Sequence, residues 1–95
     1  LRNDAGSLWE NFLIAERMKR NSNTGRFPNV YFWRDHRQRE IDYLEEDGGT
    51  IRGYEIKLGK KKAHVPDVFL EAYPESSVEV VNRDNYMDFI AGNGT

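Results

Sequence analysis

The chain has 95 residues, of which 38% are hydrophobic, 13% are aromatic and none is cysteine, and its formal net charge is −2. This length predicts one domain with one core, and the aromatic content is typical of a folded segment. The lack of cysteine excludes disulfides, thiolate zinc sites, iron–sulfur clusters and a cysteine nucleophile. We find no signal peptide and no apolar run near the roughly 18 residues of a membrane span, so we expect a cytoplasmic protein without a membrane partner.

Charge is unevenly distributed along the chain. Residues 1–62 hold 13 Lys and Arg against 10 Asp and Glu, whereas residues 63–95 hold 1 against 6. Bulk charge therefore does not favour a nucleic-acid partner. A local basic surface on the first two-thirds of the chain would still allow DNA to bind.

Hydrophobic spacing predicts a helix, three strands, a second helix and a fourth strand. Ser7 and Glu10 have the spacing of a capping box in front of the first helix, and Pro66 suits the start of the second. Residues 47–50 contain two glycines and indicate a tight turn. The predicted helices span 8–20 and 66–73, the strands 30–34, 40–45, 51–58 and 77–82, and a helical turn 86–90.

Connection lengths predict the topology of this α/β fold. Short links favour an antiparallel meander of the first three strands, and the helical crossover favours a fourth strand parallel to a neighbour. We therefore expect a mixed four-stranded sheet with flanking helices, in αβββαβ order. Residues 1–6 are expected to be a connection, 7–90 the single domain and 91–95 a frayed tail.

Two carboxylates and a lysine are expected to meet on one face of this sheet. Strand alternation places Glu55 and Lys57 on the same face, while the other face is apolar. Hairpin pairing about the turn places Asp42 opposite Glu55, with Cβ atoms about 5 Å apart. Such carboxylates repel each other unless a cation lies between them, and Mg²⁺ (or Mn²⁺) takes oxygen ligands, commonly only one or two of them protein carboxylates.

This arrangement predicts phosphoester chemistry. Lys57 would stand beside a metal-bound water and orient or deprotonate it for attack on phosphorus, while the metal neutralises charge on the phosphate. Glu10, near the start of the first helix, is a candidate for a further metal ligand, directly or through water.

The set of Glu10, Asp42 and Glu55-Ile56-Lys57 on this element order resembles the PD-(D/E)XK nuclease superfamily, which has the restriction-endonuclease-like fold. It more closely resembles an uncharacterised domain at the C-terminus of predicted bacterial and archaeal AAA+ ATPases. The similarity covers roughly residues 4–82. It is strongest in residues 8–12 (LWENF), 31–34 (YFWR), 39–44 (REIDYL) and 54–57 (YEIK).

The resemblance implies a Mg²⁺-dependent domain that hydrolyses phosphodiesters of DNA. Asp42 and Glu55 would be metal ligands, Lys57 the catalytic lysine and Glu10 the helix carboxylate, and the backbone carbonyl of Ile56 would be a further ligand. The resemblance also implies an ATPase part before this domain, in agreement with a first residue that is not Met. The chain has no G-x-x-x-x-G-K-[ST] motif, so we expect no ATP site and no covalently bound cofactor here.

Each of these assignments has a simpler alternative. Glu55 and Lys57 could be a surface ion pair of little energetic value, and Glu10 could serve only as a helix cap. Four basic residues are candidates for contact with a phosphate backbone, or else solvated: Lys60, Lys61, Lys62 and Arg34. The two histidines, His36 and His64, are expected to be exposed rather than ligands. Four aromatic residues are expected in the core rather than as a stacking platform for bases: Trp9, Phe12, Phe32 and Trp33.

A second functional hypothesis is a nuclease-like module without catalysis. It would dock on the ATPase part, on a protein partner or on nucleic acid. The acidic last third suits a protein surface better than a phosphate backbone, through Glu71, Glu75, Glu79, Asp84 and Asp88. A third alternative is that this piece has no activity by itself.

Overall fold

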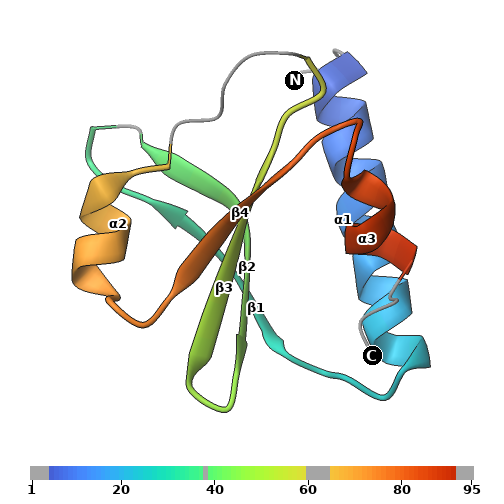
Figure 1. Cartoon of the computed structure of the whole chain (residues 1–95), viewed down its shortest axis with the longest axis horizontal. Coiled ribbons are helices and arrows are strands. Elements are labelled where there is room, and N and C mark those ends of the chain that lie inside the picture. Colours follow the sequence, from blue (N-terminus) through green and yellow to red (C-terminus); the bar gives the residue numbers. More distant parts are fainter. Residues whose placement is uncertain (1–4, 38, 60–64, 92–95) are drawn as a thin grey trace.

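The computed structural model describes residues 5–37, 39–59 and 65–91 and has three layers, with one sheet between helices on its two faces (Figure 1). The helices are α1 (Ala5–Asn23), α2 (Asp67–Ala72) and α3 (Tyr86–Ala91), and the strands are β1 (Asn29–Arg34), β2 (Glu40–Asp47), β3 (Thr50–Ile56) and β4 (Ser77–Val81). The predicted αβββαβ order is confirmed, with α3 formed from the expected final helical turn.

The sheet has the predicted mixed topology. Its strand order is β1-β2-β3-β4, with β1, β2 and β3 antiparallel and β4 parallel to β3. The turn between β2 and β3 consists of Gly48 and Gly49, whose φ angles are 59° and 88°. Positive φ at both central residues is typical of a type I′ hairpin, which explains the two glycines. This turn sets the register, which runs from Asp47 opposite Thr50 to Tyr43 opposite Tyr54.

A bulge interrupts the pairing of β1 with β2. Tyr31 pairs with Leu44 and Trp33 with Ile41, so that β2 has one more residue than β1 over this stretch. Ile41 and Leu44 consequently belong to the same hydrophobic cluster, although regular alternation would place them on opposite faces. Asp42 lies in this irregular segment.

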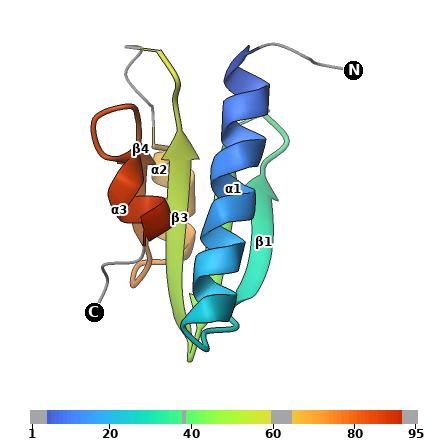
Figure 2. The same ribbon diagram turned by 90° about the vertical axis from the view of Figure 1, so that its right-hand side faces the viewer.

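Each face of the sheet has its own hydrophobic cluster. The α1 and α3 helices lie side by side on one face (Figure 2), where the buried residues are Leu13, Tyr43, Tyr54, Ile56, Val81 and Phe89. On the α2 face the buried residues are Ile41, Leu44 and Phe69, with Trp33 packed edge-on to Phe69. No helix in the described part of the chain is long and apolar enough to cross a membrane.

Several expectations about the first helix and the core are wrong. Helix α1 already includes Ala5 and Gly6, so Ser7 lies inside the helix and is not its N-cap. Phe12 and Phe32, expected in the core, are exposed by 52% and 54%, whereas Trp9 and Trp33 are partly buried as expected. The face of α1 that meets the sheet is instead formed by Leu13, Arg17 and Asn21.

Candidate active site

The Asp42 carboxylate lies where the pairing between β2 and β3 ends. The paired ladder stops at Tyr43 and Tyr54, so Asp42 and Glu55 are one step beyond its last pair. Asp42 Oδ2 accepts a hydrogen bond from the backbone N–H of Ile56 at 2.8 Å. Burial raises the pKa of Asp42, and the Ile56 N–H and the positive charge of Lys57 oppose this increase. The carboxylate therefore holds β3 in place next to the bulge.

Glu55 is a buried carboxylate with incomplete hydrogen bonding. Glu55 is only 5% exposed, and its Oε1 atom is buried without a hydrogen-bond partner. Burial and the nearby charge of Asp42 raise the pKa of Glu55 to about 7, while Lys57 and the backbone N–H of Asp42 act in the opposite direction. An unpartnered buried oxygen is costly, and it is a position where a ligand could be gained.

Lys57 follows β3 directly and is half-buried. Its backbone N–H donates to the carbonyl of Val81 at 2.9 Å, which fixes its position beside β4. Its positive charge partly offsets the increase that burial causes in the pKa of Asp42 and of Glu55. Within the described residues it forms no ion pair. The structure thus brings Asp42, Glu55 and Lys57 together, as the alternation and the hairpin register predict.

The structure does not bring Glu10 into the same group. Glu10 belongs to α1, which covers the face of Tyr43 and Tyr54, whereas Glu55 shares the α2 face with Gly53. No group of three or more Asp, Glu or His side chains able to hold a metal exists among residues 5–37, 39–59 and 65–91. Of the three carboxylates expected as metal ligands, Asp42 and Glu55 therefore lie together and Glu10 does not. The backbone of Ile56, the further expected ligand, follows Glu55 directly in the chain.

A second buried carboxylate, Glu45, is the polar residue that sequence reasoning missed. It accepts hydrogen bonds from Arg17 Nε at 2.9 Å and Nη2 at 3.0 Å, from Asn21 Nδ2 at 2.8 Å and from the Tyr43 hydroxyl at 2.8 Å. These donors outweigh its burial and lower its pKa to about 2. The spacing of Leu13, Arg17 and Asn21 along one face of α1 was the available signal.

Comparison with known proteins gives a family. Residues 5–93 match the model of the family described as domain of unknown function (DUF4143). The chain belongs to the DUF4143 family. No curated protein and no solved structure matches it.

The basic residues expected to contact nucleic acid in this DUF4143 chain have different surroundings. Arg34 is exposed at the end of β1, donates to Glu40 Oε2 at 3.0 Å and lies over the ring of Phe32. Lys60, Lys61, Lys62 and His64 lie outside the described residues. Of the other residues near Arg34, His36 is exposed as expected and Arg39 pairs with Asp35 at 2.7 Å.

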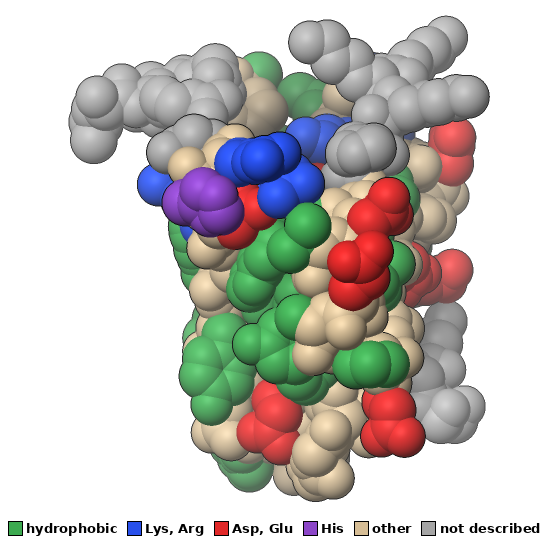
Figure 3. All heavy atoms as spheres, turned by 90° about the vertical axis from the view of Figure 1, so that its left-hand side faces the viewer, with side chains coloured by type: hydrophobic (Ala, Val, Ile, Leu, Met, Phe, Trp, Pro, Cys, Tyr) green, Lys and Arg blue, Asp and Glu red, His purple; other side chains and the backbone are tan. Residues whose placement is uncertain are grey.

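Figure 3 shows the α2 side of the molecule, where Arg, Lys and His side chains gather at one end. Below them is an apolar area. It includes a groove of about 470 Å³ between β1 and α2, lined by Tyr31, Phe32, Trp33, Phe69 and Tyr73 among others. This DUF4143 domain thus presents a basic end beside an exposed apolar surface.

Proposed function

We propose that this DUF4143 domain is nuclease-like and hydrolyses phosphodiesters of DNA with Mg²⁺ or Mn²⁺, as one part of a protein whose other part is an ATPase. The observation that carries the proposal is the buried Oε1 of Glu55, which lacks a partner beside Asp42 and Lys57. A purely structural carboxylate at this depth would be expected to have its hydrogen bonds satisfied, as those of Glu45 are.

The chemistry of the donor set fits a divalent cation. Asp42 and Glu55 offer hard carboxylate oxygens. Burial raises the pKa of both carboxyl groups, so a positive charge between them would stabilise both ionised forms. Mg²⁺ retains several waters and commonly binds through one or two carboxylates, so two acidic ligands are sufficient. The Ile56 carbonyl is a further ligand that the resemblance implies.

In this proposal each residue has a separate role. Asp42 and Glu55 would hold the ion, and the ion would stabilise the negative charge that develops on the phosphate. Lys57 Nζ would orient the attacking water, or as a neutral amine beside the dication would accept its proton, while the new P–O bond forms and the ester P–O bond breaks. The ion would also stabilise the charge on the departing oxygen. Arg34 would contact the backbone of DNA, as would Lys60, Lys61 and Lys62, which lie outside the described residues.

Cleavage of plasmid and linear DNA in Mg²⁺ or Mn²⁺ tests the proposal. We expect the Lys57→Ala variant to cleave at least about 100-fold more slowly than the unchanged protein, as is usual when a general base is removed. Glu55→Gln should weaken metal binding, measured by titration calorimetry with Mn²⁺. Glu79→Gln, which changes an exposed carboxylate on β4, is the matched control and should leave both measurements unchanged.

Equal cleavage by the unchanged protein and by Lys57→Ala, or no cleavage by either, would remove the catalytic part of the proposal. Mn²⁺ density between Asp42 and Glu55 in a soaked crystal would support the metal site independently of activity. A crystal in which Lys57 pairs with Glu55 and no metal binds would contradict it.

A second candidate is a non-catalytic module that docks on the ATPase part of the same protein. The observation that favours it is the apolar groove between β1 and α2, together with exposed Tyr31 and Phe32 on the edge strand β1. Exposed apolar patches of this kind often mark interaction surfaces. Under this alternative, Tyr31→Ser would reduce association with the ATPase part, whereas Lys57→Ala would have no effect in any assay.

A further inference from the structure

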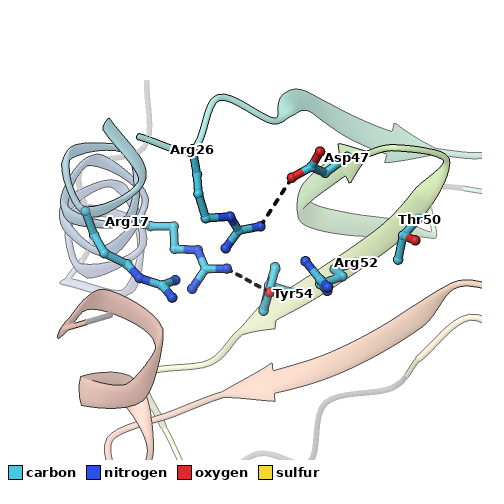
Figure 4. Close-up of a pocket in the computed structure, with 7 residues that line it drawn as sticks. Arg17, Arg26, Asp47, Thr50, Arg52 and Tyr54 are labelled. Carbon is cyan, nitrogen blue, oxygen red and sulfur yellow. Dashed lines mark hydrogen bonds and ion pairs between the residues drawn. The ribbon is translucent and has the colours of Figure 1, made fainter. Parts of the chain in front are cut away.

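A second polar pocket lies on the α1 side of the sheet, near the turn between β2 and β3. Its volume is about 530 Å³, and it lies between the second half of α1 and the strands. Arg17, Arg20, Arg26 and Arg52 line it, together with Asp47, Thr50 and Tyr54. Figure 4 shows the guanidinium groups of Arg17, Arg26 and Arg52 directed into the same space. The pocket shares no lining residue with the group of Asp42, Glu55 and Lys57.

Arg20 is the residue with unsatisfied hydrogen bonding in this pocket. Its Nε and Nη1 atoms are buried and have no hydrogen-bond partner. Burial lowers the pKa of Arg20, and the positive charges of Arg17 and Arg26 lower it further. Buried guanidinium donors without acceptors are costly, so an acceptor at this position would stabilise the folded protein.

The positive charges of the pocket are only partly compensated. Arg17 is paired with Glu45 at 2.9 Å, and Arg26 with Asp47 at 3.7 Å. Among the residues that the structure describes, neither Arg20 nor Arg52 has an ion pair with a carboxylate. Two guanidinium charges therefore face the pocket without a counter-charge.

We propose that this pocket binds the phosphate dianion of a small ligand. A phosphate dianion carries two negative charges, which equals the number of uncompensated guanidinium groups, and its several oxygens accept from the fork of N–H donors that arginine presents. The volume falls within the range of sites for small molecules, about 300–1,000 Å³, so the ligand is inorganic phosphate or a small phosphorylated molecule such as a nucleotide.

Thermal unfolding in inorganic phosphate, compared with chloride at equal ionic strength, tests the site. A ligand that binds only the folded state raises the unfolding temperature, so phosphate should raise it and chloride should not. Arg20→Gln and Arg52→Gln should each weaken phosphate binding about tenfold or more, as measured by calorimetry. Arg83→Gln changes an exposed arginine in the loop before α3 and should bind as the unchanged protein does.

The outcomes separate the two sources of the phosphate group. Tighter binding of adenosine monophosphate than of inorganic phosphate would assign the pocket to a nucleotide-like ligand, and equal binding would assign it to phosphate alone. Because Arg52 is exposed, Arg52→Gln keeps the test valid if Arg20→Gln fails to fold. An equal effect of phosphate on all three variants and on the unchanged protein, or no effect on any, would overturn the proposal.

Discussion

Two buried glutamates on neighbouring strands have opposite electrostatic surroundings. Glu45 on β2 is 1% exposed and Glu55 on β3 is 5% exposed, yet the pKa of Glu45 is lowered to about 2 and that of Glu55 is raised to about 7. The difference comes from partners rather than from depth. Glu45 meets the guanidinium of Arg17 and two further donors, whereas Glu55 meets the carboxylate of Asp42 and keeps one oxygen unpartnered.

This comparison distinguishes a structural charge from a candidate functional one. Arg17 also donates to the carbonyl of Phe89 at 3.0 Å and to the Tyr54 hydroxyl at 3.0 Å, so one ion pair connects α1, α3 and two strands. Removing such a pair on one side leaves an uncompensated buried charge. Glu55 makes no comparable connection, and its ionisation is unfavourable until a cation approaches.

Glu45→Gln should therefore have the largest effect on stability. The substitution leaves the buried Arg17 guanidinium without its counter-charge, and we expect the free energy of unfolding to fall by about 3–5 kcal/mol, measured by urea denaturation. The matched Glu55→Gln variant should lose far less, because it removes a charge that is already unfavourable in the absence of metal.

If Glu45→Gln does not fold, the double variant Arg17→Met, Glu45→Met provides the measurement, because replacing both partners with apolar residues is often close to neutral. A stable Glu45→Gln protein with a loss below about 1 kcal/mol would contradict the structural role of the pair.

The pH dependence of stability should separate the two glutamates next. Folded Glu55 keeps its proton up to about pH 7, whereas an unperturbed Glu loses it near 4.5. Its contribution therefore makes the free energy of unfolding fall by about 3 kcal/mol as pH rises through this window. Glu45 acts in the opposite sense, because its stabilisation is present above about pH 4.5 and is lost as pH falls towards 2.

Urea denaturation across this pH range, with a chelator present, provides the measurement. Subtracting the curve of Glu55→Gln from that of the unchanged protein isolates the Glu55 contribution. A difference curve that is flat between about pH 4.5 and 7 would show that Glu55 ionises normally.

The elements and the topology of the fold could be predicted because their determinants are local. Two glycines at 48–49 fix a hairpin turn, and a short helix between β3 and β4 requires a crossover to a parallel strand. Two further local rules, alternation along β3 and counting across the turn, predicted that Asp42, Glu55 and Lys57 lie close together. Counting did not predict the bulge in β2 at Asp42, nor the hydrogen bond that the Asp42 carboxylate accepts from the Ile56 N–H.

The remaining errors arose where tertiary partners override residue type. Arg17 and Asn21 are polar, and only the presence of Glu45 on the facing strand makes their burial favourable. Phe12 and Phe32 are apolar but exposed, and their chain neighbours Leu13 and Trp33 pack in the two hydrophobic clusters instead. Glu10 lies on α1, and the face of the sheet that α1 covers could not be derived from the spacing of residues in the helix alone.

Tyr43→Phe should have the smallest effect on the free energy of unfolding. It measures whether the other hydrogen-bond donors to Glu45 can stabilise its carboxylate without the Tyr43 hydroxyl. The variant removes one hydrogen bond of 2.8 Å to Glu45 Oε2, while the bonds from Arg17 and Asn21 to the same oxygen remain. We expect a loss of about 1 kcal/mol in the free energy of unfolding, because the remaining donors still satisfy the carboxylate. Tyr31→Phe, at an exposed position on β1, is the control and should be neutral. A loss close to that of Glu45→Gln would mean that the hydroxyl is essential to the ion pair, and that Glu45 is less fully satisfied than its contrast with Glu55 requires.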